Sequence, residues 1–387
     1  MRNKFKRILD LKEPIKKKSH FLFGPRQTGK SWLLESQFPK APTYNLLLSD
    51  VFLRLSARPY LLREEIFAGI DTGSIDKSKP VIIDEIQKLP ILLDEVHYLI
   101  EKTGLHFILT GSSARKLKRT GVNLLGGRAW TRHLCPLVSA EVPDYDLNRI
   151  LNYGGLPSIY LSEFPEEDLR AYVGTYLKDE IVAEGIARNI PGFHSFLETA
   201  ASSNGELLNF AAIASDSGVP ARTVIEYYRV LEETLIGSVL EPFDGTKKRK
   251  AISTSKFYFF DIGVCNFLAN SWPVKPRTPF YGKALEHFIF LELLAYLEYK
   301  NDHRKLSFWR STSNFEVDFV LGGDTAIEVK SSDRISPRHL KGLHALAEDI
   351  HLRKSIIVCT ERTPRKIGAV LALPVRQFLK MLWDGGV

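Results

Sequence analysis

The chain has 387 residues, of which 44% are apolar and 25% are charged. These values are ordinary for a globular protein and exclude intrinsic disorder, a collagen-like repeat and a small disulfide scaffold. Lys and Arg total 53 against 45 Asp and Glu, which gives a formal net charge of +8. A basic protein favours anionic partners, nucleic acid before anionic lipid, although mild basicity is also common without such a partner. At roughly 150 residues per domain, the length predicts two or three domains.

Cysteine usage and hydropathy indicate the compartment. The three cysteines, Cys135, Cys265 and Cys359, lie far apart, and their odd number favours reduced, buried thiols over a disulfide framework. The N-terminal residues contain no apolar segment of signal-peptide length. Charged residues interrupt every apolar stretch before it reaches the roughly 18 residues that span a bilayer. The sequence therefore predicts a cytoplasmic protein with no membrane partner.

Residues 1–145 are predicted to form an α/β domain. Short apolar runs alternate there with longer mixed segments, which is typical of fully buried parallel strands with helices on both faces of the sheet. The predicted strands are residues 20–23, 44–48, 81–83 and 106–109.

Residues 24–31 read GPRQTGKS, a full match to the phosphate-binding P-loop pattern, and they lie between a predicted strand and a predicted helix. Gly24 and Gly29 let the backbone curl so that its N–H groups face the phosphates of ATP. Lys30 is expected to reach the β- and γ-phosphates, and the Ser31 hydroxyl is expected to bind Mg²⁺. The remaining residues of the predicted nucleotide-binding loop are Pro25, Arg26, Gln27 and Thr28.

The strand at 81–83 ends in two acids, Asp84 and Glu85. At the carboxyl end of a parallel strand, Asp84 can hold the Mg²⁺ water shell while Glu85 polarises the attacking water. Alone, such a pair is often a solvated turn or a helix cap. About fifty residues after a P-loop, it indicates a metal and general-base pair, and the sequence predicts Mg²⁺-dependent ATP hydrolysis.

Two further positions are candidates for the same site. The strand at 106–109 leads to Ser112 and Ser113, which either contact the γ-phosphate or the catalytic water, or cap the next helix. Arg128 follows the stretch LLGG and can act as an arginine finger, in its own chain or from a neighbouring subunit. The alternative for Arg128 is an ordinary surface arginine.

Residues 146–270 are predicted to be helical, with a winged helix in their second half. A first helix over 208–213, a turn at 217–220 and a second helix from Ala221 form a helix-turn-helix pattern. A strand at 236–240 and the four cations Lys247–Lys250 are then expected to form a hairpin whose basic tip suits DNA phosphates. The winged helix is also used simply for protein packing. The stretch 271–279 is predicted to be a linker.

Residues 280–387 are predicted to form a second α/β domain. Asp318 lies on one predicted strand, and Glu328 and Lys330 share one face of the next, because side chains alternate along a strand. Two carboxylates and a lysine on one face can bind Mg²⁺ and deprotonate a water. The alternative is an exposed ribbon whose polar face carries these residues by chance. The predicted elements are a helix over 284–299 and strands over 306–310, 316–321, 326–330 and 355–359.

The motifs GPRQTGKS, VIIDE, ILTGSS and LLGGR resemble those of prokaryotic AAA-superfamily ATPases with a C-terminal domain of unknown function. This resemblance implies an AAA+-like sheet and possible assembly into homo-oligomers. The Asp318…Glu328-x-Lys330 spacing resembles the PD-(D/E)xK nuclease core, in which Glu286 matches the position of another metal carboxylate; Val317 stands where that core has proline. The resemblance continues through YGGLP (153–157), YLKDE (176–180), KFYFFDIG (256–263), residues 282–290 and residues 316–332.

The sequence therefore predicts an ATPase with ATP and Mg²⁺ as cofactors, DNA as partner and DNA cleavage as a possible output. One alternative is a nucleotide-gated regulator that binds DNA or protein through an inactive nuclease-like fold. Another is an AAA+ remodeller of protein partners. The predicted catalytic residues are Lys30, Glu85, Arg128, Asp318, Glu328 and Lys330, and the predicted metal ligands are Ser31, Asp84, Glu286, Asp318 and Glu328.

Overall fold

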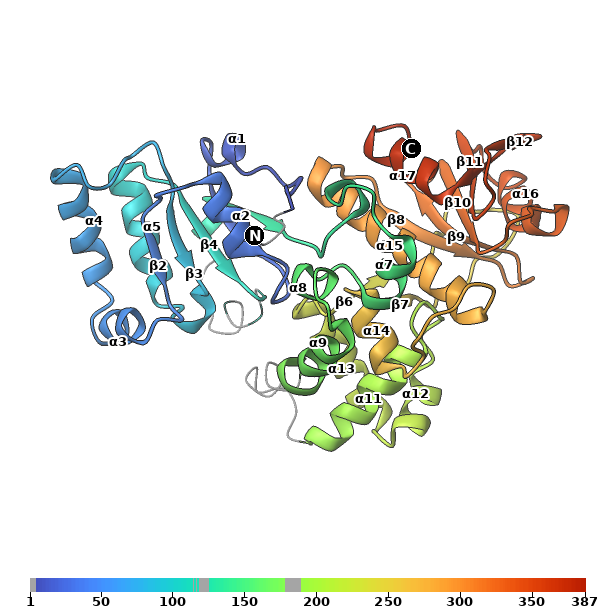
Figure 1. The fold of residues 1–387 in the computed structure, drawn as a ribbon, viewed down its shortest axis with the longest axis horizontal. Coiled ribbons are helices and arrows are strands. Elements are labelled where there is room, and N and C mark those ends of the chain that lie inside the picture. Colours follow the sequence, from blue (N-terminus) through green and yellow to red (C-terminus); the bar gives the residue numbers. More distant parts are fainter. Residues whose placement is uncertain (1–4, 114, 116, 118–124, 178–188) are drawn as a thin grey trace. The chain divides into compact units, whose positions relative to one another are not determined.

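The computed structural model describes residues 5–113, 115, 117, 125–177 and 189–387 (Figure 1). The chain forms two compact units. Residues 7–135 and 233–235 make up the N-terminal unit, and residues 136–232 and 236–387 make up most of the C-terminal unit. The helical middle and the second α/β region, predicted as separate domains, are thus parts of one compact unit.

The N-terminal unit is built on a parallel sheet of five strands in the order β2-β3-β4-β1-β5. Four of these strands coincide with the predicted apolar runs. The fifth was not predicted because it is an edge strand with exposed polar side chains and lacks an apolar run. The strands are β1 (Ser19–Phe23), β2 (Thr43–Asn45), β3 (Val81–Asp84), β4 (Phe107–Gly111) and β5 (Ala129–His133).

Helical elements connect these strands, and the apolar sides of those within residues 49–103 complete one core with the strand residues Phe21, Ile83 and Leu109. Because parallel strands all end at the same edge of a sheet, the segments that follow β1, β3 and β4 meet there. The helical elements are α1 (Lys12–Ile15), α2 (Lys30–Gln37), α3 (Ser49–Ala57), α4 (Leu61–Asp71), η1 (Ile86–Lys88), α5 (Leu92–Thr103) and η2 (Leu125–Gly127).

The C-terminal unit contains a six-stranded mixed sheet in the order β12-β13-β11-β10-β9-β8, drawn in orange to red in Figure 1. Side chains alternate across β10, with Ile327 and Val329 in the core beside the long helix α15 (Pro279–Lys300) and Ala326 in a second core on the other face. The strands are β8 (Leu306–Arg310), β9 (Glu316–Leu321), β10 (Thr325–Lys330), β11 (Lys354–Cys359), β12 (Arg365–Ile367) and β13 (Val370–Pro374).

The helical part of this unit has its own core of aromatic and aliphatic side chains, which includes Phe196, Tyr228 and Phe257. No helix in the described part of the chain combines the length and the apolar character needed to cross a bilayer. The remaining helical elements are η3 (Ser139–Glu141), α7 (Leu147–Tyr153), α8 (Pro157–Tyr160), α9 (Pro165–Ala171), η4 (Tyr172–Leu177), α11 (Ile190–Ser202), α12 (Phe210–Ser217), α13 (Ala221–Glu233), α14 (Ile262–Leu268), η5 (Pro337–Leu340), α16 (Lys341–Ala347) and α17 (Val375–Trp383).

Helices α12 and α13 form the expected pair, and the antiparallel strands β6 (Gly237–Leu240) and β7 (Lys256–Phe259) follow them. The connection between these strands, which carries residues 247–250, does not project from the unit but pairs with β8. Backbone N–H groups of Phe243 and Ile252 donate to carbonyls of β8, and Thr312 donates to the Lys250 carbonyl. The physical reason is that β8 is the edge strand of the sheet, and this connection covers its unpaired backbone groups.

The segment 271–279, expected to be a linker, is packed instead. Val274 is buried, and its backbone N–H and carbonyl both bind the side-chain amide of Asn152 at 2.8 and 3.1 Å. The Pro and Lys residues of this stretch give it the composition of a linker, but the buried Val274 holds it against the rest of the unit.

The YGGLP and KFYFFDIG motifs pack against each other around Asp261, which is fully buried. Its carboxylate accepts the backbone N–H groups of Gly155 and Val264 at 2.8 and 3.0 Å. Burial raises the pKa of Asp261 to about 6, although these N–H groups oppose the shift. Gly263 sits so close to Tyr153 that a Cβ would lie 2.2 Å from the Tyr153 carbonyl oxygen.

Gly263→Ala is therefore expected to lower the free energy of unfolding of the C-terminal unit by about 2 kcal/mol, because backbone must move to admit the methyl group. Gly174→Ala is the matched control, since a Cβ there meets nothing within 4 Å. Denaturant unfolding of both variants checks the prediction. Equal stability of the two would show that the contact at Gly263 is not tight in solution.

Candidate functional site

The P-loop curves between β1 and α2 and is tied down at several points. Gly29 has φ 91° at the start of α2, a left-handed conformation that favours glycine. The Thr28 hydroxyl donates to the Pro25 carbonyl at 2.8 Å. The guanidinium of Arg7 donates to the carbonyls of Thr28 and Cys135. Sequence reasoning missed Arg7, because no local pattern links it to a loop some twenty residues away.

Lys30 is buried at the first position of α2, and its ammonium lies inside the curve of the loop. Its Nζ donates to the carbonyls of Gly24 and Pro25 at 2.6 and 3.2 Å. The amino end of α2 adds the partial positive charge of the helix dipole at the same place. This arrangement is a ready site for an anion such as a phosphate group.

Ser31 and Asp84 meet at the end of the sheet. The Ser31 hydroxyl donates to Asp84 Oδ2 at 3.2 Å, and the Thr110 hydroxyl donates to Asp84 Oδ1. A hydroxyl and a carboxylate are hard oxygen ligands, and Mg²⁺ is usually bound by one or two such groups together with phosphate and water. The donor set therefore fits Mg²⁺. Thr110, which sequence reasoning missed, fixes the orientation of the Asp84 carboxylate.

Glu85 is buried in a left-handed conformation with φ 62°. A non-glycine residue pays roughly 1 kcal/mol or more for this conformation, and such strain clusters at functional sites. The Glu85 N–H donates to Thr110 Oγ1 at 3.1 Å. The side-chain amide of Gln87 donates to Glu85 Oε2 at 2.5 Å and to Ser112 Oγ at 3.3 Å. Gln87 thus links the candidate base to the serine that follows β4.

The two serines after β4 have different roles in the structure. Ser112 lies within the site through Gln87, whereas Ser113 Oγ accepts the backbone N–H of Arg115 at 3.4 Å in the manner of a helix cap. Ser112 therefore lies where the phosphate or water contact was expected, and Ser113 makes the contact expected of a helix cap.

Arg128 precedes β5 and lies away from this site. Because β5 runs parallel to β1, with Ala129 opposite Ser19, Arg128 is at the edge of the sheet where β1 begins. The P-loop follows the other end of β1, roughly 16 Å along a five-residue strand. The Arg128 guanidinium pairs with Glu101. This position favours an ordinary surface arginine, or a finger for the nucleotide of a neighbouring subunit, over a finger within its own chain.

The C-terminal unit brings Asp318, Glu328 and Lys330 together on β9 and β10. Lys330 Nζ lies 2.5 Å from Glu328 Oε1 and 3.7 Å from Asp318 Oδ2. The backbone N–H of Val329 donates to Asp318 at 2.7 Å. Burial, followed by the charge of Glu286, raises the pKa of Asp318 to about 6. Burial, followed by the charge of Asp318, raises the pKa of Glu328 to about 8.

Glu286, on α15, faces two partners that the sequence did not indicate. Its Oε1 accepts the Tyr258 hydroxyl at 2.6 Å and lies 3.3 Å from Lys256 Nζ. Lys256 also pairs with Glu316 Oε1 at 2.8 Å. Within the described residues no group of three or more His, Cys, Asp or Glu side chains is placed to hold a metal ion. The paired carboxylates of Asp318 and Glu328 still have the donor chemistry that Mg²⁺ requires.

The basic run Lys247–Lys250 is partly engaged within the unit. Arg249 pairs with Glu348 and donates to the Ala345 carbonyl at the end of α16. Lys248 Nζ donates to the Glu348 carbonyl at 2.8 Å. The side chains of Lys247 and Lys250 are exposed.

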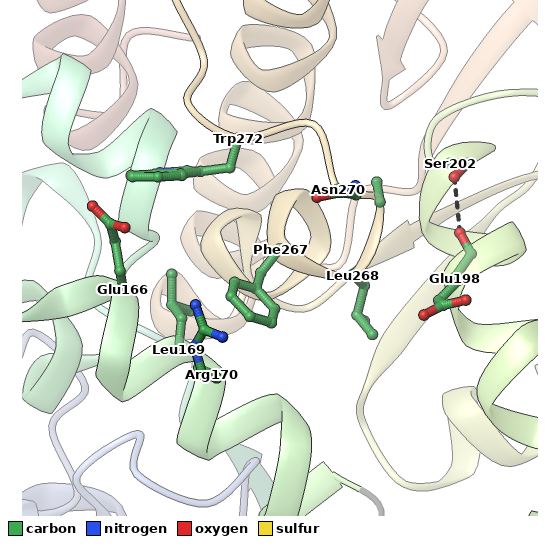
Figure 2. A pocket seen from close by; sticks show the side chains of 10 residues that line it. Glu166, Leu169, Arg170, Glu198, Ser202, Phe267, Leu268, Asn270 and Trp272 are labelled. Carbon is green, nitrogen blue, oxygen red and sulfur yellow. Dashed lines mark hydrogen bonds between the residues drawn. The ribbon is translucent and has the colours of Figure 1, made fainter.

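A cavity of about 540 Å³ in the C-terminal unit shares no residue with these sites (Figure 2). Figure 2 shows the Glu166 carboxylate beside the ring of Trp272, and the ring of Phe267 between Arg170 and Leu268. Its lining residues are Glu166, Leu169, Arg170, Glu198, Ser202, Phe267, Leu268, Ala269, Asn270 and Trp272.

Three family models match parts of the chain. Residues 16–142 match a model described as an AAA domain. Residues 144–273 and 281–378 each match a model described as a domain of unknown function (DUF8612 and DUF4143). No curated protein matches the chain. The AAA match spans the five-stranded parallel sheet and the phosphate-binding loop, so the N-terminal unit is similar to an AAA domain and is consistent with a P-loop domain.

Among solved structures, the chain is similar to a Signal Transduction ATPase with Numerous Domains (STAND) protein with a tetratricopeptide repeat sensor from Pyrococcus horikoshii. The two are 15% identical over 78% of this chain and 50% of that one, with a TM-score of 0.25. The chain thus spans about half the length of that structure. A TM-score this low establishes no shared fold.

Proposed function

We propose that the N-terminal unit binds ATP with Mg²⁺ and hydrolyses it. The observation that carries this proposal is the contact between the Ser31 hydroxyl of the P-loop and Asp84, directly beside the buried Glu85. This contact supports the proposal because it joins two segments far apart in the sequence, the loop at 24–31 and the acids that follow β3, at one edge of a parallel sheet.

Each residue has a chemical role in this proposal. The backbone of residues 24–31 and the Lys30 ammonium bind the phosphates, and Ser31 and Asp84 hold Mg²⁺. The metal that these two residues would hold would supply positive charge to offset that of the phosphates. Glu85 orients the attacking water and accepts its proton, while Ser112 and Gln87 lie where the γ-phosphate side of the site is expected.

The test is phosphate release from ATP by the full chain, with Mg²⁺ and with excess EDTA. We expect turnover with Mg²⁺ and none in EDTA, because the metal supplies charge that the side chains do not. No phosphate release in Mg²⁺ would contradict hydrolysis, and equal rates in both buffers would contradict the roles of Ser31 and Asp84.

The C-terminal unit supports a second candidate function, Mg²⁺-dependent DNA cleavage. The juxtaposition of Asp318, Glu328 and Lys330 favours it, since such a set can hold a metal and deprotonate a water. Cleavage of DNA in Mg²⁺ or Mn²⁺ that Asp318→Ala removes would support a nuclease. DNA-stimulated ATP turnover without cleavage would favour the regulator, and turnover that ignores DNA would favour protein partners.

If DNA contacts the exposed part of the basic run, the double change Lys247→Ser and Lys250→Ser is expected to weaken DNA binding at low salt. Each lost phosphate contact removes about 0.9 from the slope of log affinity against log salt, so the slope should fall by about 2. The matched control changes Lys300 and Lys380, two exposed lysines of the same unit, to serine. A slope unchanged by the first pair would remove this segment from the interface.

A further inference from the structure

Two lysine ammonium groups, that of the half-buried Lys330 and that of the buried Lys256, lie among four carboxylates beside β9 and β10. Lys330 contacts Asp318 and Glu328, which are its neighbours on these strands. The second cation, Lys256, comes from β7 and is only 4% exposed. Its Nζ lies between Glu316 Oε1 at 2.8 Å and Glu286 Oε1 at 3.3 Å. The candidate metal site therefore already holds a cation from the helical part of the unit.

The register of β7 directs this ammonium to Glu286. Lys256 and Tyr258 are two residues apart, so both side chains leave the same face of the strand, and both contact Glu286 Oε1. Backbone pairing of Lys256 with Leu240 of β6 and with Leu207 fixes the position of the strand. The Tyr258 ring also stacks on Phe290 of α15, with ring centroids 4.2 Å apart. The placement of the ammonium is thus built into the hairpin.

Lys256 is charged at this position. Burial by itself lowers the pKa of an ammonium, but the neighbouring carboxylates, Glu286 first and then Glu316 and Asp318, outweigh it and raise the pKa of Lys256 above its usual value. The same contacts place Lys256, Glu286 and Asp318 within electrostatic reach of one another. An ammonium is therefore fixed where a divalent cation would be attracted.

We propose that Lys256 is a built-in counter-ion that competes with a divalent cation for the carboxylates of Glu286 and Asp318. This proposal rests on the proposed metal site of the C-terminal unit. It adds that Lys256 controls how tightly this site binds a divalent cation. A divalent cation held by Asp318 is repelled by the Lys256 ammonium, and Glu286 is not free to bind it while the ion pair stands. Removal of the ammonium frees Glu286 and strengthens metal binding.

The test is calorimetric titration of the nucleotide-free full chain with Mn²⁺. Lys256→Met is expected to bind Mn²⁺ at least about tenfold more tightly than the unchanged chain, whereas Lys256→Arg keeps the charge and should leave the affinity unchanged. Lys283→Met is the matched control. Lys283, on α15, also forms an ion pair with a glutamate, Glu206, but this pair is exposed to solvent. Its affinity should equal that of the unchanged chain.

Thermal unfolding supplies a second readout that needs no catalytic activity. Lys256→Met leaves Glu286 and Glu316 without their ammonium, so its midpoint should fall without metal and recover more than that of the unchanged chain in Mn²⁺. Lys256→Gln retains hydrogen bonding and replaces the methionine variant if that variant does not fold. In the double change with Asp318→Ala the gain in affinity should vanish.

Equal Mn²⁺ affinity in the unchanged chain and in Lys256→Gln would overturn the competition, as would a gain that survives Asp318→Ala. A failure of the nuclease proposal can be told apart from a failure of this one. In that case the DNA stays uncut, while substitution of Lys256 still changes the Mn²⁺ affinity.

Discussion

Lys30→Ala is expected to weaken ATP binding by on the order of 100-fold, because the β- and γ-phosphates lose a buried ammonium and its charge-assisted hydrogen bonds. In the structure the Lys30 Nζ lies inside the loop, on the carbonyls of Gly24 and Pro25. Bound phosphate oxygens offer the same ammonium stronger, charged acceptors. Titration with a fluorescent ATP analogue measures the change.

The matched control is Lys77→Ala, since Lys77 is an exposed lysine of the same unit. It should bind ATP as the unchanged chain does. Circular dichroism of both variants separates a lost contact from a lost fold. A folded Lys30→Ala variant with unaltered ATP affinity would contradict the assignment of residues 24–31 as the phosphate cradle.

Glu85→Gln is expected to retain ATP binding and to lower the rate of hydrolysis at least about 100-fold, which is the usual contribution of a general base. Glutamine preserves the size of the side chain, and its carbonyl oxygen can still accept the Gln87 amide. It cannot accept the proton of the attacking water. Single-turnover hydrolysis at saturating ATP measures the chemical step apart from binding.

The control for this variant is Glu64→Gln, on the exposed side of α4. Its hydrolysis rate should be that of the unchanged chain. If Glu85→Gln lost ATP affinity as well as turnover, the contacts of Glu85 with Thr110 and Gln87 would be structural supports of the site, and the base would have to be sought elsewhere.

The strands that carry the N-terminal site were predictable because they are short, continuous apolar runs buried on both faces. The P-loop and the Asp84–Glu85 pair follow such runs directly, so their meeting at one edge follows from parallel topology. Thr110, near the end of β4, carried a similar signal that the sequence analysis did not use, whereas Gln87 lies in the turn η1 beyond the end of β3. The sequence left the role of Arg128 open because β5, an edge strand, has no apolar run to show its direction.

The C-terminal unit was less predictable for a different reason. Its strands and the juxtaposition of Asp318 with Glu328 follow from alternation and a short turn, which are local features. Lys256 reaches Glu286 and Glu316 across 30 and 60 residues of chain, and no local pattern marks such a contact. The basic run 247–250 was predicted at a hairpin tip, and no local pattern shows that the connection carrying it pairs with the edge strand β8.

The central claim is that the N-terminal unit hydrolyses ATP with Glu85 as the base. Its most direct test is steady-state phosphate release from ATP and Mg²⁺, measured side by side for the unchanged chain and Glu85→Gln from matched preparations. We predict turnover by the unchanged chain and at most about a hundredth of that rate in the variant. Equal rates in the two proteins, or no phosphate release by the unchanged chain, would contradict the claim.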